Sequence, residues 1–265
     1  PYHTDPLILQ QVGQILSDLG VTVLTDDVFR KPESHGFGKL NIVSPWSYPH
    51  RVVQAAMEVA KLPHNVQLIQ LNSFGCGPDS FFMDETRDIL KAVGKNITVL
   101  RIDEIASPGS IRLRLRSLVE SLKAVKSLDG VSSDFYNGYS VPYKKAKDAK
   151  KTILVPWLCD FISPFAPALG ELLGLKVQNL PKSNKLSPDL GLMYGNNEVC
   201  YPSTLVLGDI IAALQSGNYA VKDIVLAITQ TGGQCRATNY IAQIIIGLQN
   251  AGFNDIPVIA LSSGE

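Results

Sequence analysis

The chain alternates short β-branched apolar runs with longer amphipathic runs, and this alternation constrains its fold more than any other feature. Apolar residues in strict alternation or in short continuous runs predict strands, whereas apolar residues three and four apart predict helices. Residues 1–125 contain four such strands, at 21–27, 39–45, 66–73 and 97–104, and four helices, at 5–20, 48–62, 77–94 and 109–125. Strands that alternate with helices predict a parallel sheet covered by helices, an α/β fold.

The alternation stops at residues 126–151, which are polar, contain Gly, Ser and Pro, and end in a basic run. It then resumes with strands at 152–158, 176–181, 223–230 and 256–263 and helices at 163–175, 201–217 and 236–252. We therefore predict two flavodoxin-like parallel-sheet domains, at 1–125 and 152–265, joined by a linker at 126–151. The alternative is one domain with a long surface excursion.

Composition excludes several classes of protein. Lys plus Arg equals Asp plus Glu, 24 against 24, so no net charge attracts nucleic acid. No apolar run approaches the roughly 20 residues of a membrane span. The four cysteines are too few for a disulfide scaffold, which predicts reduced thiols and a cytoplasmic protein. The sequence starts at Pro1 without a methionine, and we expect it to be part of a longer chain.

Three of the four cysteines directly precede a predicted helix. Cys76 and Cys235 lie between a strand and a helix, next to the glycines of GCGP and TGGQC, and Cys200 precedes a helix that Pro202 opens. A helix N-terminus carries partial positive charge and favours a thiolate, the form that binds metals. Glycine lets backbone N–H groups approach a bulky anionic ligand. This pattern indicates a metal site, but small buried core residues would give it equally well.

Two long stretches resemble one protein family. NNEVCYPSTLVLGDIIAALQSGNY (196–219) and ITQTGGQCRATNYIAQ (228–243) resemble the large activase-related proteins of the 2-hydroxyacyl-CoA dehydratase system. PYHTDPLI, SPWSYPHRVVQAA and QLNSFGCGPDS resemble the preceding region of the same proteins. In that family a long polypeptide carries acetate-kinase/hsp70-like ATPase domains, followed by a region similar to a dehydratase subunit. The present chain resembles the latter region.

The resemblance implies a cofactor and its ligands. Related dehydratase subunits hold a [4Fe–4S] cluster through three cysteines with one iron left open, and some relatives hold a double-cubane iron–sulfur cluster. Carried over, Cys76, Cys200 and Cys235 become the metal ligands. Arg236 follows Cys235 directly and either neutralises cluster charge or holds a phosphate-bearing substrate, or else pairs with a carboxylate at the domain edge. The implied function is an electron-transfer module of anaerobic metabolism, supplied with low-potential electrons by the ATPase activator and able to reduce a small molecule or an acyl-CoA.

Other interpretations remain open at this point. The chain could instead be a non-catalytic scaffold with structural cysteines or zinc, or a small-molecule-binding α/β region without metal. Cys159 matches no family cysteine, and either a buried inert thiol or an extra ligand fits it. His3 lies in a turn-like segment and is either a proton donor or a hydrogen-bonded surface residue. No phosphate-binding Gly-rich loop for ATP, NAD or FAD appears in the sequence.

Overall fold

The computed structural model describes residues 3–5, 12–29, 47–72, 79–101, 108–124, 141, 143–144, 148, 150–230 and 236–262. Within these residues the protein is an α/β protein with eight α-helices and two parallel sheets, as the alternating pattern predicts. The chain divides into two compact units: unit 1 is Pro1–Leu40 with Ser44–Asn137, and unit 2 is Asn41–Val43 with Gly138–Glu265. The main division therefore falls within the range 126–151.

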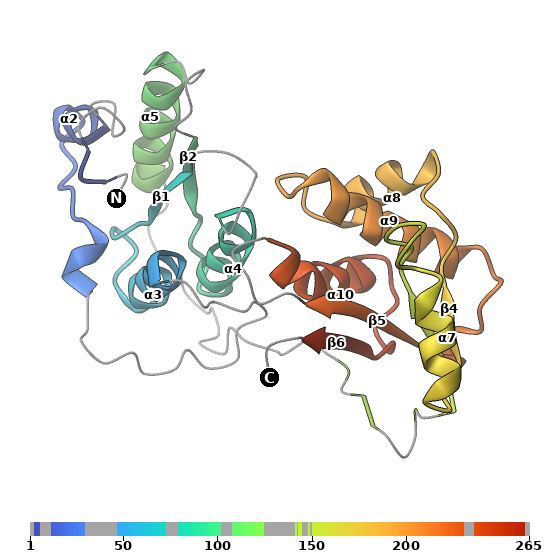
Figure 1. Cartoon of the computed structure of the whole chain (residues 1–265). Helices are drawn as coiled ribbons and strands as arrows, with labels where there is room; N and C mark the ends of the chain where they lie inside the picture. Colours follow the sequence, from blue (N-terminus) through green and yellow to red (C-terminus); the bar gives the residue numbers. More distant parts are fainter. Residues whose placement is uncertain are drawn as a thin grey trace. The chain divides into compact units, whose positions relative to one another are not determined.

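Unit 1 is built on two parallel strands, β1 (Ile69–Asn72) and β2 (Thr98–Arg101). Its described helices are α2 (Val12–Asp18), the 3-10 helix η1 (Asp26–Phe29), α3 (Ser47–Lys61), α4 (Asp79–Ala92) and α5 (Pro108–Ala124). In Figure 1 the two strands lie between the α2–α5 pair and the α3–α4 pair. Helices therefore cover both faces of this sheet.

The side chains of β1 alternate between those two faces, as a pleated strand requires. Ile69 and Leu71 pack into the apolar cluster formed with α2 and α5. Gln70 and Asn72 are buried on the other face, where Thr86 of α4 donates a hydrogen bond from Oγ1 to Gln70 Oε1 at 2.8 Å. One face of β1 is thus apolar and the other polar.

A buried lysine joins β2 to the end of α3. Lys95 is only 3% exposed and precedes β2. Its ammonium donates to the backbone carbonyl oxygens of Val59 at 2.6 Å, Leu62 at 2.7 Å, Pro63 at 3.1 Å and Val66 at 3.1 Å. The last carbonyls of a helix have no partner within the helix. Lys95 therefore caps the C-terminal end of α3 and the turn that follows it.

The prediction of a strand at 21–27 is wrong. The first five of these residues have no regular structure, and η1 takes up the last two. Thr25 starts this turn: its carbonyl accepts from the Val28 N–H at 3.3 Å, and its Oγ1 donates to Asp27 Oδ2 at 3.2 Å. Such local hydrogen bonds compete with strand pairing. The strand predicted at 39–45 lies outside the described residues.

Unit 2 is built on four parallel strands in the order β4–β3–β5–β6. Leu154 pairs with Gln178 on one side and with Leu226 on the other, and Leu226 pairs in turn with Val258. The strands are β3 (Thr152–Val155), β4 (Val177–Asn179), β5 (Ile224–Gln230) and β6 (Val258–Ser262). The helical elements are α7 (Phe165–Leu172), α8 (Leu186–Tyr194), α9 (Tyr201–Gln215), η2 (Val221–Asp223), η3 (Arg236–Asn239) and α10 (Tyr240–Asn250).

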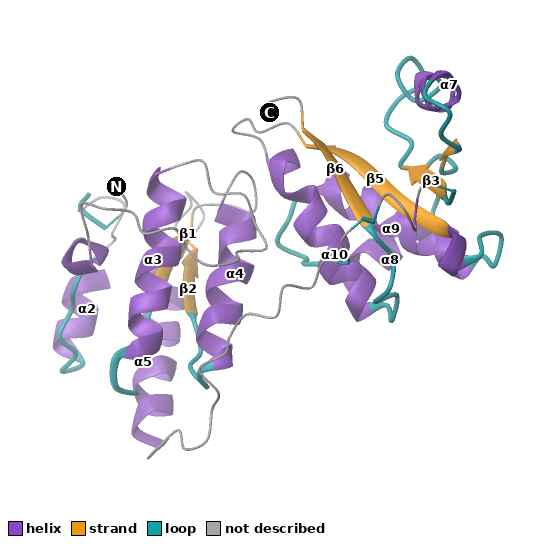
Figure 2. Ribbon diagram, turned by 90° about the horizontal axis from the view of Figure 1, so that it is seen from below, coloured by secondary structure: helices purple, strands orange, loops and turns teal. Residues whose placement is uncertain are grey.

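The main core of unit 2 lies between its sheet and helices α9 and α10. Ile224, Leu226 and Ile228 of β5 face these helices, whereas Val225 and Ala227 belong to a second cluster on the opposite face of the sheet. Figure 2 shows α8, α9 and α10 on the same side of β5 and β6. Because β5 is buried on both faces, it reads in sequence as a continuous apolar run.

Helix α8 was not predicted from the sequence, since LSPDLGLMY contains Pro, Asp and Gly and has no clear apolar stripe. Small residues bring it against α9. A Cβ at Gly208 would collide with the backbone of Ser187, and a Cβ at Gly191 would collide with the backbone of Thr204. The absence of side chains at these two glycines lets the two helices approach closely. Tertiary packing therefore decides that this weakly patterned segment is helical.

Helix α7 packs along β4 through Gly170, where a Cβ would meet the side chain of Val177. Most of its large apolar side chains are exposed, among them Phe165, Leu169 and Leu172. No helix in the described ranges is both long enough and apolar enough to cross a membrane.

Candidate functional site

The first helical turns of α9 and α10 meet at one end of unit 2, and Cys200 lies there. Both helices connect to strands of one parallel sheet and run opposite to them, so both begin near the carboxyl ends of the strands. In open α/β sheets this end is where ligands bind. Cys200 is the N-cap residue of α9, in extended conformation, and its side chain makes no capping hydrogen bond. Its thiol is therefore available for other partners.

That thiol contacts a tyrosine of the neighbouring helix. Cys200 Sγ lies 3.1 Å from Tyr240 Oη, and Cys200 is only 7% exposed. Tyr240 is the first residue of α10 and also packs against the main core cluster of unit 2. A sulfur and a hydroxyl at this distance share a hydrogen bond in which either atom can be the donor.

The two helices face each other in register around this contact. Ser203 Oγ donates to Gln243 Oε1, one turn beyond the Cys200–Tyr240 pair. One turn further still, a Cβ at Gly247 would collide with the side chain of Leu207. In each of these three pairs, the residue of α10 therefore comes 40 positions after the residue of α9. This regular spacing shows that packing between whole helices places the tyrosine hydroxyl at the thiol.

The side-chain amide of Gln243 is a further polar donor near Cys200 and Tyr240. Gln243 is 5% exposed, and its Nε2 has no hydrogen-bond partner among the described residues. A Cβ at Gly195 would come within 3.1 Å of this nitrogen. Gly195 caps the end of α8 and begins the short connection that leads to Cys200. A buried donor without a partner carries a cost in free energy, which is relieved when an acceptor binds.

The structure describes only part of the predicted ligand set. Cys200 is described as above, whereas Cys76 and Cys235 lie outside the described residues. Cys76 belongs to the sequence of unit 1, and Cys200 and Cys235 belong to unit 2. Arg236 opens η3 directly after Cys235, and only its backbone is described. The proposed convergence of the three thiols therefore stays a prediction.

Cys159 follows β3, the strand next to β5, and its side chain is half-buried and free. The backbone N–H groups of Leu158 and Cys159 donate to Ser163 Oγ at 2.8 and 3.2 Å. The carbonyl of Cys159 accepts from the Ser163 N–H at 2.9 Å. Cys159 thus belongs to a hydrogen-bonded turn after β3, and its thiol makes no described contact with Cys200 or Tyr240.

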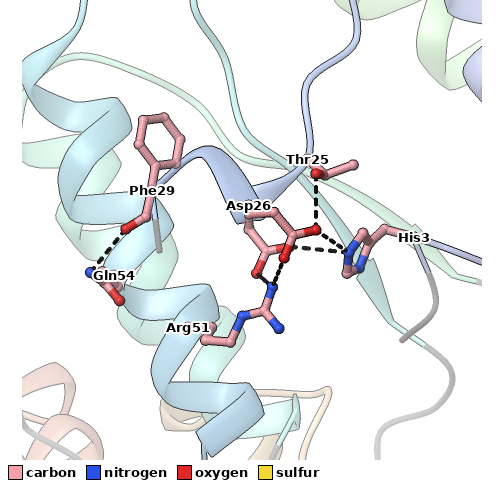
Figure 3. Close-up of polar contacts among 7 residues, drawn as sticks. His3, Thr25, Asp26, Phe29, Arg51 and Gln54 are labelled. Atoms are coloured by element: carbon pink, nitrogen blue, oxygen red, sulfur yellow. Dashed lines mark hydrogen bonds and ion pairs between the residues drawn. The ribbon is translucent and has the colours of Figure 1, made fainter. Parts of the chain in front are cut away.

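A cluster of charged side chains in unit 1 ties the N-terminal segment to η1 and α3. Arg51 Nη2 lies 2.7 Å from Asp26 Oδ2 and 2.8 Å from Asp27 Oδ1. His3 Nε2 lies 3.5 Å from Asp26 Oδ1 and 3.2 Å from Asp27 Oδ2. Figure 3 shows His3 and Arg51 approaching Asp26 from two directions. His3 is therefore a hydrogen-bonded surface residue, one of the two roles that its position in the sequence allowed.

The same cluster has the composition of a metal site, but its carboxylate oxygens already have partners. The ligand atoms of His3, Asp26 and Asp27 lie within 4.8 Å of one another. However, all four carboxylate oxygens are engaged by Arg51 or His3. The hydrogen bond from His3, followed by those from Thr25 and the charge of Arg51, lowers the pKa of Asp27 against the opposing effect of burial. We interpret the cluster as an ion-pair network that holds η1 on α3.

The search for relatives adds no identification, since no protein-family model, curated protein or solved structure matches this chain. The fold and the site define an α/β protein with parallel sheets and a buried thiol at paired helix N-termini. Sequence reasoning missed Tyr240, Gln243 and the Asp26–Asp27–Arg51 network. Tyr240 and Gln243 had a signal in the sequence, because both lie in the motif ITQTGGQCRATNYIAQ (228–243) that contains Cys235.

Proposed function

We propose that this chain is an iron–sulfur redox module of a system similar to the ATP-dependent activases and 2-hydroxyacyl-CoA dehydratases. One observation carries the proposal: the Cys200 thiol is buried at the N-terminus of α9, beside the first residue of α10, at the ligand-binding end of a parallel sheet. Helix N-termini favour anionic ligands and thiolates. The NNEVCYP and TQTGGQC motifs supply the independent support from sequence.

The described donors fit such a cofactor. Cys200 would be one thiolate ligand, and Tyr240 Oη and Gln243 Nε2 would provide hydrogen-bond donors to an anionic group. Cys76 and Cys235 would complete the ligand set, and Arg236 would offset negative charge. When bound, a cluster of the [4Fe–4S] or double-cubane type supplies one-electron chemistry at low potential. The protein residues orient the ligand sulfur and exclude water from it.

We further propose that unit 2 is a flavodoxin-like domain and that the chain works with an ATPase and a small-molecule acceptor. The strand order of unit 2, second–first–third–fourth in chain order, supports a flavodoxin-like domain. An acetate-kinase/hsp70-like ATPase would deliver the electron, and an acyl-CoA or another small molecule would accept it. We infer both partners from the resemblance of the sequence motifs.

Iron and acid-labile sulfide analysis after anaerobic reconstitution tests the proposal. We expect the wild-type protein to bind iron and sulfide and to show the broad visible absorption of an iron–sulfur cluster. Cys200→Ala should lose most of the iron because a thiolate ligand is removed. Cys159→Ala is the matched control, since it also removes one thiol of unit 2, and it should keep the iron.

The same measurement distinguishes the iron–sulfur module from a non-catalytic scaffold. A colourless protein that binds zinc through Cys200 would support a scaffold with a structural metal site. Equal iron contents in wild type and Cys200→Ala would remove Cys200 from the ligand set and overturn the proposal.

A further inference from the structure

The contact between Tyr240 and Cys200 is built into the packing of unit 2. Leu207 occupies the space left open by Gly247, and Ser203 bonds Gln243, so that α9 and α10 cannot slide past each other. Cys200 and Tyr240 are the next pair in this register. A flexible surface tyrosine could reach many atoms, whereas this one begins a helix and packs against buried core residues. Its hydroxyl is therefore held at the sulfur.

The direction of the hydrogen bond depends on the state of the sulfur. A free thiol can donate or accept, as can a tyrosine hydroxyl. A sulfur bound to a metal carries no proton and can only accept, so the hydroxyl must then be the donor. Donors to ligand sulfurs withdraw electron density and raise the reduction potential of an iron–sulfur cluster.

We propose that Tyr240 is a positioning residue that donates a hydrogen bond to the Cys200 sulfur, orients this ligand and raises the reduction potential of the cluster. This inference rests on the proposed function for its redox consequence, but the contact itself exists without metal. The burial of Cys200 strengthens the effect, because a hydrogen bond shielded from water is electrostatically stronger than an exposed one.

Tyr240→Phe tests the inference because it removes one oxygen and leaves the packed ring in place. Tyr219→Phe is the matched control, since Tyr219 also packs against the core cluster of unit 2. Cys200→Ala identifies the signals that belong to Cys200. Circular dichroism and thermal unfolding check that each variant folds as the wild type does.

The first readout uses the metal-free protein. The infrared S–H stretching band of Cys200 is obtained as the difference between the spectra of wild type and Cys200→Ala. We expect this band to shift in Tyr240→Phe and to stay unchanged in Tyr219→Phe. A band that is identical in both variants and in the wild type would overturn the contact.

The second readout is the reduction potential of the reconstituted protein, measured in a redox titration that is monitored by electron paramagnetic resonance. We expect Tyr240→Phe to keep its iron and to shift to a more negative potential, with Tyr219→Phe at the wild-type value. If the wild type holds iron and has the same reduction potential as Tyr240→Phe, the redox role of Tyr240 is overturned and the proposed function is not. Wild-type protein that takes up no iron would overturn the proposed function, and the redox role of Tyr240 with it.

Discussion

The two units hold their helices in place by different means. Unit 1 depends on polar groups: the buried Lys95 ammonium caps α3, buried Thr86 bonds Gln70, and Arg51 binds two aspartates near the surface. Unit 2 depends mainly on close contact at glycines, as at Gly208, together with the buried Ser203–Gln243 hydrogen bond between α9 and α10. Hydrogen bonds and ion pairs respond to pH and charge, whereas close packing responds to side-chain volume. The candidate site lies in unit 2, where the volumes of the packed side chains set the positions of the helices.

The largest effect that we expect comes from Gly208→Ala in unit 2. A new Cβ would collide with the backbone of Ser187, which cannot move without shifting α8. Alanine gains about 1 kcal/mol of helix propensity over glycine. We nevertheless expect the free energy of unfolding to fall by about 3 kcal/mol, the upper part of the range for overpacking. Urea denaturation followed by circular dichroism measures it.

Gly247→Ala is the graded control for this prediction. The three atoms nearest to its Cβ would all belong to the side chain of Leu207, which can change its rotamer, so a smaller loss is expected. If Gly208→Ala were as stable as the wild type, the close approach of α8 to α9 would not exist in solution.

A smaller effect is expected from Lys95→Met in unit 1. The change leaves buried carbonyl groups without their donor, which costs about 2 kcal/mol of unfolding free energy. Chemical denaturation of the variant measures this loss. Lys91→Met, an exposed change on the neighbouring helix α4, is the control and should change stability by less than about 0.5 kcal/mol. Equal losses in the two variants would contradict the capping role of Lys95.

The burial of Lys95 should also make the free energy of unfolding depend on pH. Burial lowers the pKa of Lys95 from its ordinary value of 10.5. Between the lowered pKa and 10.5 the unfolded chain binds more protons than the folded chain, so this group makes stability rise with pH in that window. The cost of burying the charge is fully present below the lowered pKa. The wild type should therefore gain stability relative to Lys95→Met as the pH rises through this window.

The smallest effect is expected at the ion-pair network of unit 1. The hydrogen bond from His3 is the main cause of the lowered pKa of Asp27, so His3→Gln should raise that pKa toward its ordinary value of 3.8. A lowered carboxyl pKa contributes stability above the ordinary value and loses it as the pH falls through the folded value. Solvent screens these exposed groups, and the change in stability should be slight.

Carboxyl carbon NMR titration measures this shift. Asp160 gives an internal control in the same spectra, because its pKa is lowered mainly by Lys182 and should not respond. An unchanged Asp27 titration in His3→Gln would show that the His3 contact does not persist in solution.

Much of the fold could be predicted from the sequence because its patterns are local. The predicted helix at 201–217 appears as α9 (Tyr201–Gln215), and the predicted strand at 223–230 appears as β5 (Ile224–Gln230). The failures occurred where local patterns were weak or in conflict. The run at 21–27 is β-branched enough for a strand, but its Thr and Asp side chains form a turn instead.

The candidate site could be predicted only in part. A thiol before a helix is visible in the sequence, and Cys200 is indeed the N-cap of α9. Its partner Tyr240 was not identified, because 40 positions separate them and no local rule connects them. The network of His3, Asp26 and Arg51 likewise joins three segments that are remote in the sequence.

The sequence by itself determined the α/β class, most helices and strands, and the position of Cys200 before a helix, because hydrophobic periodicity and capping act over a few residues. Only the tertiary structure decided the helicity of α8, the strand order of unit 2 and the meeting of Cys200 with Tyr240. These depend on how whole elements fit together, and at Gly208 and Gly247 that fit depends on the absence of a side chain.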